Sequence, residues 1–157
     1  MNARFLSTLI IVPFALAVLS GCTADAVTDS LSINFGETTV AVEKAGSQAT
    51  LNGSITVRMV NLTEKQMNVG FLEGEIIDAS TGEALVRFRP IIPESYGSIS
   101  TARLLPKETR DIPVILPLGL EAFDAARHPR VVVGLFLQTT DGYRTDVKSL
   151  PVVVTTK

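Results

Sequence analysis

The sequence has a single cysteine, Cys22, and a single histidine, His128. One cysteine excludes an intramolecular disulfide, and the two residues together are too few for a zinc site or a Cys–His nucleophile. A Ser–His–Asp triad would have to use His128, which we expect to be solvated in a loop, and no serine lies in a G-x-S-x-G motif. There is no D-x-D-x-D-G calcium loop. The sequence therefore predicts no catalytic residue, no metal ligand and no cofactor, and we expect the protein not to be an enzyme.

Long apolar runs are also scarce, and the one near the N-terminus is too short to span a membrane. Residues 5–19 carry no charge, but a spanning helix needs about 20 apolar residues, and Pro13 interrupts the run. A basic tip, a short apolar core and small residues after it are typical of a secretory signal peptide. We therefore expect residues 1–21 to be a signal peptide that is removed.

The residues Leu19-Ser20-Gly21-Cys22 at the end of this run resemble the lipobox of bacterial lipoproteins. The resemblance implies that the thiol of Cys22 is acylated and that Cys22 becomes the new N-terminus. In that family an Asp after the cysteine favours the inner membrane. Thr23 stands there instead, which implies a lipid anchor in the outer membrane, facing the periplasm. Cleavage at a later site formed by Ala24 and Ala26 is the alternative, and we expect residues 22–30 to be a lipidated tether.

An excess of positive charge is missing as well. The sequence carries 14 Lys and Arg against 16 Asp and Glu, and loss of the signal peptide removes one basic residue, Arg4. Without a basic run, a nucleic-acid partner is excluded, and there is no electrostatic reason to lie on anionic lipid. The lipobox resemblance implies the membrane as a partner, through the N-terminal lipid. The anchor, the short tether and the lack of reactive groups favour an envelope protein as the other partner.

Residues 31–157 show short alternating runs separated by turn residues, the pattern of a β domain. In the clearest run, the odd-numbered residues from Leu51 to Met59 face one way and the even-numbered ones face the other. Pro113 removes a hydrogen-bond donor from its strand, which predicts an edge strand. Residues 119–126 are expected to form a short helix that ends before Pro129. Further strands are expected over residues 31–35, 39–42, 99–105 and 111–116.

The register of a first hairpin can be predicted from its loop, Ser80-Thr81-Gly82, with Gly82 in the left-handed conformation. In this register the ring of Phe88 lies across Gly74 and covers the missing side chain. Opposite charges meet on the other face. The predicted pairs are Ile76 with Val86, Gly74 with Phe88 and Leu72 with Pro90 on the apolar face, and Glu75 with Arg87 and Glu73 with Arg89 on the other.

A second hairpin has the predicted loop Thr140-Asp141-Gly142. A two-residue Asp-Gly turn would instead place Leu137 opposite Asp146, which is an unfavourable pair. The predicted pairs are Leu137 with Thr145, Leu135 with Val147 and Val133 with Ser149 on the inner face, and Gln138 with Arg144 and Gly134 with Lys148 outside.

About eight short strands and one short helix predict an all-β fold, an antiparallel two-sheet sandwich over residues 31–157. The order of turns between Leu51 and Leu116 resembles the Ig/fibronectin-like domains of the LEA14/WHy kind and of several bacterial envelope lipoproteins. The turns that carry the resemblance are Asn61-Leu62-Thr63, Asp78-Ala79-Ser80-Thr81-Gly82 and Pro106-Lys107-Glu108. The resemblance implies an Ig/fibronectin-like sandwich, and it implies no activity.

The loop Arg89–Gly97 is the candidate contact surface, through Ile91, Ile92 and Tyr96, because aromatic residues on loops often serve binding. The alternative is that the isoleucines continue the preceding strand while Tyr96 packs over an open end of the fold.

Two functions are compatible with these features. The first is a lipid-anchored periplasmic lipoprotein that makes protein–protein contacts as an accessory or structural component of an envelope assembly. The second is a periplasmic lipoprotein that binds a small apolar or lipidic ligand between its sheets.

Overall fold

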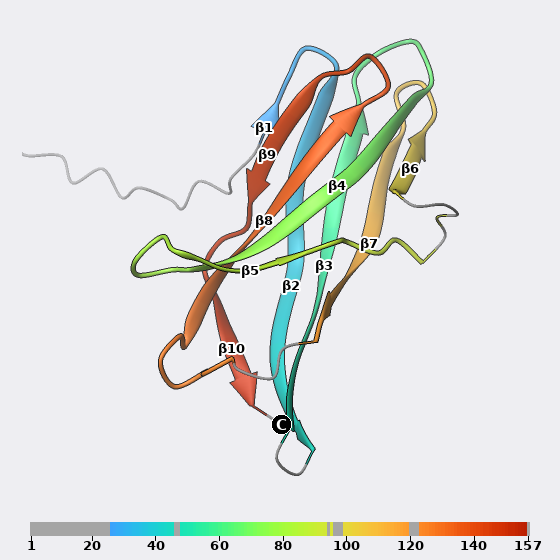
Figure 1. Cartoon of the computed structure of the whole chain (residues 1–157). Coiled ribbons are helices and arrows are strands. Elements are labelled where there is room, and N and C mark those ends of the chain that lie inside the picture. Colours follow the sequence, from blue (N-terminus) through green and yellow to red (C-terminus); the bar gives the residue numbers. More distant parts are fainter. Residues whose placement is uncertain (1–25, 46–47, 94, 96–98, 120–122, 157) are drawn as a thin grey trace, which may run out of the picture.

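The computed structural model describes residues 26–45, 48–93, 95, 99–119 and 123–156 (Figure 1). Within these ranges the fold is all-β, as predicted, and it contains ten strands and no helix. The strands are β1 (Ala26–Val27), β2 (Leu31–Ala45), β3 (Gln48–Asn61), β4 (Met67–Asp78), β5 (Ala84–Phe88), β6 (Ser100–Leu104), β7 (Thr109–Leu118), β8 (Arg130–Thr139), β9 (Arg144–Lys148) and β10 (Val152–Thr156).

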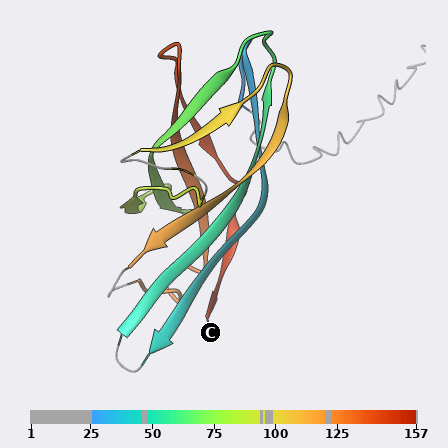
Figure 2. The ribbon, with the colours of Figure 1, turned by 90° about the vertical axis from the view of Figure 1, so that its right-hand side faces the viewer.

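The strands form one mixed sheet that curls around the core, in the order β5-β4-β8-β10-β2-β3-β7. β1 also pairs with β2, β6 with β4, and β9 with β8. Strands β2, β3 and β7 form one half, and β4, β8 and β9 form another that faces it (Figure 2). β10 joins the halves, because it pairs with β8 antiparallel and with β2 parallel. The expectation of a purely antiparallel sheet is therefore wrong. After Pro151, Val152 and Val153 still pair with β8, and residues 154–156 then pair with β2.

The core lies between the inner faces of the two halves. The alternation predicted for β3 is confirmed, since Leu51, Ile55, Val57 and Met59 are at most 1% exposed. From the other half, large side chains of β4 and β8 pack into the same cluster. Apolar side chains at every second position thus bury one face of β3 and of β7, and burial of the whole cluster is the main force that holds the halves together.

The register predicted for the first hairpin is confirmed at three pairs, which are Gly74 with Phe88, Glu75 with Arg87 and Ile76 with Val86. Gly82 has a φ of 74°, as its loop position requires. A Cβ atom at Gly74 would lie 2.3 Å from Cζ of Phe88, so the ring does cover the glycine. Within the described ranges, however, no ion pair joins Glu75 to Arg87 or Glu73 to Arg89.

A β-bulge at Leu72 changes the face that its neighbours occupy. The pairing of β4 with β8 shifts between Phe71 and Glu73, so Leu72 has no partner in β8. Phe71 takes the core position at 1% exposed, and Leu72 is only half-buried. β5 ends at Phe88, so the predicted pair of Leu72 with Pro90 is wrong. An extra residue in a strand inverts the alternation on which that prediction rested.

The register of the second hairpin is confirmed along its whole length. Gln138 pairs with Arg144, Leu137 with Thr145, Leu135 with Val147 and Gly134 with Lys148. Ser149 donates its N–H to the Val133 carbonyl at 2.8 Å, and its hydroxyl accepts the Val133 N–H at 2.9 Å. Gly142 has a φ of 85°.

Strands β6 and β7 lie as predicted, whereas the helix predicted over residues 119–126 does not form where the chain is described. β6 and β7 lie where strands are expected, and β7 ends the strand order, which confirms the edge position of Pro113. The predicted helix is wrong where it is described, because residues 123–127 form only irregular backbone and a turn. The Asp124 carboxylate accepts the N–H groups of Ala126 and Arg127, which closes a single turn.

β2 is a single long strand, since a register shift between Phe35 and Thr38 replaces the break expected after residue 35. β1 pairs with β2 through Ala26 and Val27. Ala26 and Val27, which lie inside the segment 22–30 that we assign to a tether from the sequence, are therefore part of the sheet.

Candidate functional site

His128 binds a buried carboxylate and is not the solvated loop residue expected from the sequence. Its Nδ1 lies 2.6 Å from Oδ2 of Asp78, and the two side chains are 18% and 4% exposed. The ring of Phe123 lies beside the imidazole, with the centroids 5.9 Å apart. The only sign of this site in the sequence is Asp78, which opens an Asp-x-Ser turn. A carboxylate at this position commonly accepts the backbone N–H two residues later.

The other carboxylate oxygen of Asp78 is fully engaged. It accepts the N–H groups of Ser80 and Thr81, both at 2.8 Å, and the Ser80 hydroxyl. The Ser80 hydroxyl is the largest cause, ahead of His128, that holds the pKa of Asp78 far below its usual range. The Ser80 hydroxyl donates to Asp78, but a carboxylate with a lowered pKa is a weak general base, so this contact does not make Ser80 an activated nucleophile. The arrangement ties the turn after β4 to the segment before β8 and has a structural role.

Asn61 is a second buried polar centre, and it is 0% exposed. Its side-chain amide donates to the carbonyls of Lys65 at 2.7 Å and Leu105 at 2.9 Å. Its oxygen accepts the N–H and the hydroxyl of Thr63. The sequence Asn61-Leu62-Thr63 also matches a glycosylation triplet, but the buried and fully bonded amide makes it a turn that joins two loops.

Two of the site residues predicted from the sequence, Cys22 and Tyr96, are not among the described residues. The lipidation of Cys22 and the contact role of Tyr96 therefore stay predictions. The described part of the chain has no group of three or more His, Cys, Asp or Glu placed to hold a metal ion. It also has no helix that is long and apolar enough to cross a membrane.

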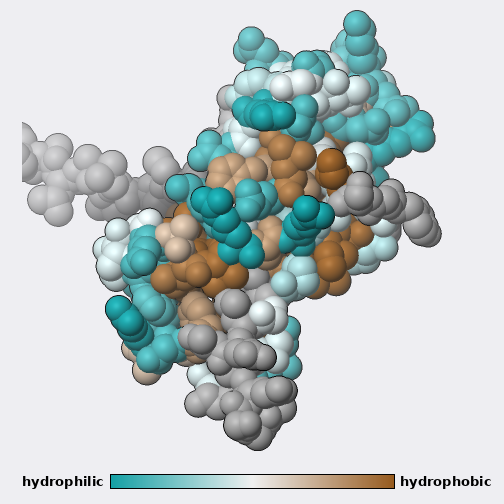
Figure 3. Space-filling view, viewed as in Figure 1, coloured by the Kyte–Doolittle hydropathy of each residue, from teal (hydrophilic) through white to brown (hydrophobic). Residues whose placement is uncertain are grey.

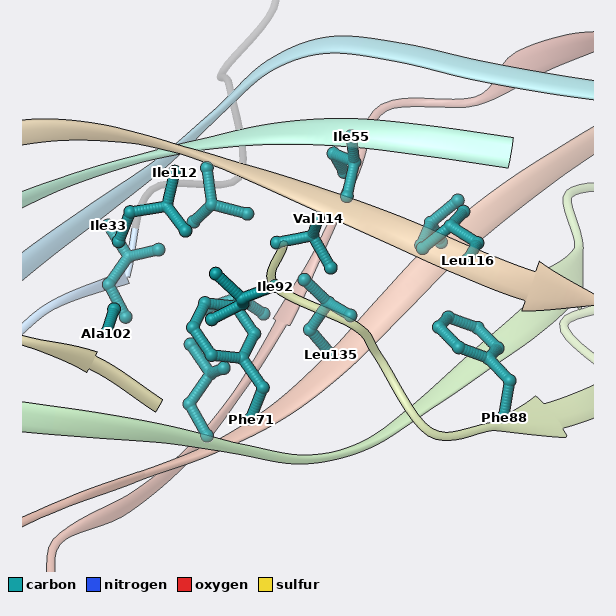
Figure 4. Close-up of a cluster of buried hydrophobic side chains, with 14 of the residues drawn as sticks. Ile33, Ile55, Phe71, Phe88, Ile92, Ala102, Ile112, Val114, Leu116 and Leu135 are labelled. Atoms are coloured by element: carbon teal, nitrogen blue, oxygen red, sulfur yellow. The ribbon is translucent and has the colours of Figure 1, made fainter. Parts of the chain in front are cut away.

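The candidate contact loop divides between the core and the surface. Ile92 is 5% exposed and packs among Phe71, Val114 and Leu135 in the core (Figure 4). The alternative that the isoleucines continue the preceding strand is wrong, because β5 ends at Phe88 and Ile91 forms an isolated bridge with Ile115. Ile91 is 45% exposed, and its backbone exchanges hydrogen bonds of 3.0 and 2.8 Å with Ile115 of β7. The segment after β5 thus closes the curled sheet against β7 and leaves the Ile91 side chain at the surface.

Ile91 and Ile115 form what we call the isoleucine pair. Residues directly opposed across an antiparallel bridge present their side chains on the same face, and these two are 45% and 44% exposed. The Ser100 hydroxyl fixes the segment further, because it donates to the Pro90 carbonyl at 2.8 Å and accepts the Ile92 N–H at 3.2 Å. Hydrophobic side chains are visible where this segment crosses β7 (Figure 3). The pair is therefore an apolar surface held by a fixed backbone.

A cleft of about 250 Å³ opens next to the isoleucine pair, between β6 and β7. We call it the β6–β7 cleft; it is lined by Ile92, Thr101, Ala102, Arg103, Arg110, Asp111, Ile112 and Pro113. Its floor is apolar, since Ile92, Ala102 and Ile112 are at most 5% exposed. Arg110 donates to the carbonyl of Arg103 at 3.1 Å, which links β7 to β6.

Asp111 on the rim of this cleft is held by Arg58 of the neighbouring strand. Two bonds of 2.7 and 2.9 Å join the guanidinium to both carboxylate oxygens. This contact lowers the pKa of Asp111 and raises that of Arg58. The carboxylate is thereby neutralised locally, whereas Arg103 donates to the neutral amide of Gln66 at 2.6 Å.

The chain matches no protein-family model and no curated protein. Among solved structures, it is similar to a target of the Northeast Structural Genomics Consortium, with 17% identity over 83% of this chain and 90% of that chain and a TM-score of 0.47. A FixG-related protein from Vibrio parahaemolyticus is 12% identical over 76% of this chain and 95% of its own, with a TM-score of 0.41. The PapD-like domain 7 of human CEP192 is 5% identical over 99% and 98%, with a TM-score of 0.42. At these identities and TM-scores the comparisons assign neither a family nor an activity.

Proposed function

We propose that this chain is a bacterial lipoprotein, anchored through Cys22 on the periplasmic face of the outer membrane, that makes protein–protein contacts in the cell envelope. Its domain is an Ig/fibronectin-like sandwich, and it serves as an accessory or structural component of an envelope assembly. The Leu19-Ser20-Gly21-Cys22 tetrad supports the anchor. The two facing halves of the curled sheet support the sandwich.

The observation that carries the contact role is the isoleucine pair. Two aliphatic side chains, each nearly half exposed, lie side by side on a backbone fixed by two hydrogen bonds. Apolar side chains presented on a rigid backbone lose little conformational freedom on binding, which favours protein–protein contact. The polar centres Asp78–His128 and Asn61 are occupied by structural bonds, which favours binding over catalysis.

Site-specific photo-crosslinking in membranes tests the contact role. A photoreactive residue at Ile91 is expected to capture a reproducible envelope protein, and one at the more exposed Val153 is not. The double variant Ile91→Lys and Ile115→Lys keeps the backbone bridge and should lower recovery of that protein at least about tenfold. The matched control is Val153→Lys, at a side chain that is 62% exposed on β10. Equal recovery with both variants would refute the contact role.

The anchor is tested separately. Cys22→Ser, or globomycin treatment of cells, should leave an unprocessed precursor. Mass analysis of the mature wild-type N-terminus should find acyl chains on Cys22. A bare thiol in protein that buffer alone removes from membranes would refute the anchor.

Neither the core between the halves nor the β6–β7 cleft favours the ligand-carrier function. The core between the halves is filled, with Phe71, Leu135 and Leu137 at most 1% exposed. The β6–β7 cleft carries two arginines and an aspartate in its lining, which an apolar ligand would not favour. Native mass spectrometry that finds a retained ligand would favour the carrier.

A further inference from the structure

The chemistry of the surface around the isoleucine pair differs from that of the chain as a whole. A second cavity, of about 300 Å³, lies close to the pair and is lined by Phe71, Leu72, Arg89, Pro90, Ile99 and Ser100. The charged residues that line this cavity and the β6–β7 cleft are Arg89, Arg103, Arg110 and Asp111. Three arginines and one aspartate stand here, on a chain with a formal net charge of −2.

The single aspartate does not offset the charge of Arg103. Asp111 already accepts hydrogen bonds from Nε and Nη2 of Arg58. Arg103 donates to the neutral Gln66 amide and lies at the rim of the cleft. A carboxylate from a partner that reached Arg103 would gain a charge-assisted hydrogen bond.

Aliphatic side chains line the same two cavities as these arginines. Ile99 is 49% exposed, and its side chain would lie 3.5 Å from a Cβ atom at Gly70. Ile91 directly precedes Ile92 of the cleft floor, and Ile115 lies on β7, which also lines the cleft. An occupant of this surface would therefore contact aliphatic groups and arginines at the same time.

The outer edge of β7, which Ile91 bridges at Ile115, indicates how a partner would bind. Ile115 directs its N–H and C=O away from β3, toward Ile91, and the pairing of β7 with β3 has no register shift. Every second residue of a regular strand repeats this direction, so the backbone at Asp111 and Pro113 also points outward. Pro113 has no N–H to offer. A partner strand added to this edge would lack one backbone hydrogen bond at Pro113. Side chains are therefore expected to determine which partner binds.

We propose that the isoleucine pair and the β6–β7 cleft together bind a segment of the partner protein that combines acidic and large apolar side chains. A carboxylate of that segment pairs with Arg103, and an apolar side chain covers Ile91 and Ile115. This inference rests on the proposed function, because it names the chemistry of the partner that the contact role requires.

Three synthetic peptides test the inference. They share length and apolar residues and differ only in carrying Glu, Lys or Ser at the polar positions. Binding to the full lipidated protein in detergent micelles is measured by fluorescence anisotropy. We expect the Glu peptide to bind at least about tenfold more tightly than the Lys peptide, and to weaken as salt rises. Equal affinity for all three peptides would overturn the inference.

Charge reversal at the cleft provides the matched variants. Arg103→Glu should weaken the Glu peptide at least about tenfold and should improve binding of the Lys peptide. Arg130→Glu is the control, since Arg130 is exposed but lines neither cavity. Gln66→Ala removes the hydrogen bond to Arg103 without changing its charge and should leave peptide binding unchanged. Equal losses in Gln66→Ala and Arg103→Glu would overturn the inference, because loop geometry would then control binding.

The two levels of proposal fail in different ways. Loss of peptide discrimination, with crosslinking at Ile91 and acylation at Cys22 intact, refutes only the acidic chemistry of the partner. Absence of crosslinked protein or of acyl chains refutes the proposed function, whatever the peptides show.

Discussion

Replacing Gly74 with alanine tests the packing of the first hairpin most directly. A Cβ atom there would lie 2.3 Å from Cζ, 2.4 Å from Cε2 and 2.9 Å from Cε1 of Phe88. Real carbon atoms do not approach so closely, so the ring must move, although it is 7% exposed and packed in the core. Overpacking of this kind costs about 1–3 kcal/mol, which for a domain of this size lowers Tm by roughly 3–10 °C.

Gly70→Ala on the same strand is the matched control. Its nearest neighbours would be Cγ2 of Ile99 at 3.5 Å and the Gln138 carbonyl oxygen at 3.7 Å, which are ordinary contacts. Because alanine restricts the unfolded chain more than glycine does, this change should be neutral or stabilising by about 0.4–1 kcal/mol. Urea denaturation and thermal melts of both variants measure the difference.

A double-mutant cycle separates the ring contact from other effects. Phe88→Leu should itself destabilise the fold, but its cost should be smaller in the Gly74→Ala background, with a coupling of about 0.5–3 kcal/mol. Equal stability of Gly74→Ala and Gly70→Ala, or strict additivity in the cycle, would refute the register and the covering ring.

Two further predictions concern the buried polar centres. The pKa of Asp78 is lowered in the fold, so its ionisation stabilises the protein above about pH 4, the unfolded value, and this stabilisation is lost as the pH falls below it. Asp78→Asn should lower the urea midpoint at neutral pH and flatten its fall between about pH 5 and pH 3, and parallel profiles would contradict this. Asn61→Ala leaves the carbonyls of Lys65 and Leu105 without their donor, so it should cost at least about 2 kcal/mol in urea denaturation, whereas a cost near zero would show that water replaces the amide.

The hairpin registers could be predicted because their determinants are local. Gly82 and Gly142 adopt the positive φ that a three-residue loop needs, and the alternation beyond each loop then sets the pairs. The bulge at Leu72 could not be predicted in the same way. Both Phe71 and Leu72 are apolar, so alternation does not decide which of them is buried, and packing against β8 does.

The candidate surface could be predicted only in part. Ile91 and Ile92 were singled out as loop residues, but neighbouring isoleucines in an extended segment point to opposite sides. Their assignment to surface and core depends on Ile115, which is remote in the sequence and forms the bridge. Asp78 and His128 are 50 positions apart, and no short pattern links them.

The amino-acid order alone determined the all-β class, the faces of β3, both hairpin registers and the edge position of Pro113, because each depends on alternation or on the backbone freedom of one residue. The tertiary structure alone decided the parallel pairing of β10, the bulge at Leu72, the partner of His128 and the exposure of the isoleucine pair. These features depend on which strand edges and buried polar atoms are still unpaired after the local elements have formed, and residues distant in the sequence satisfy them.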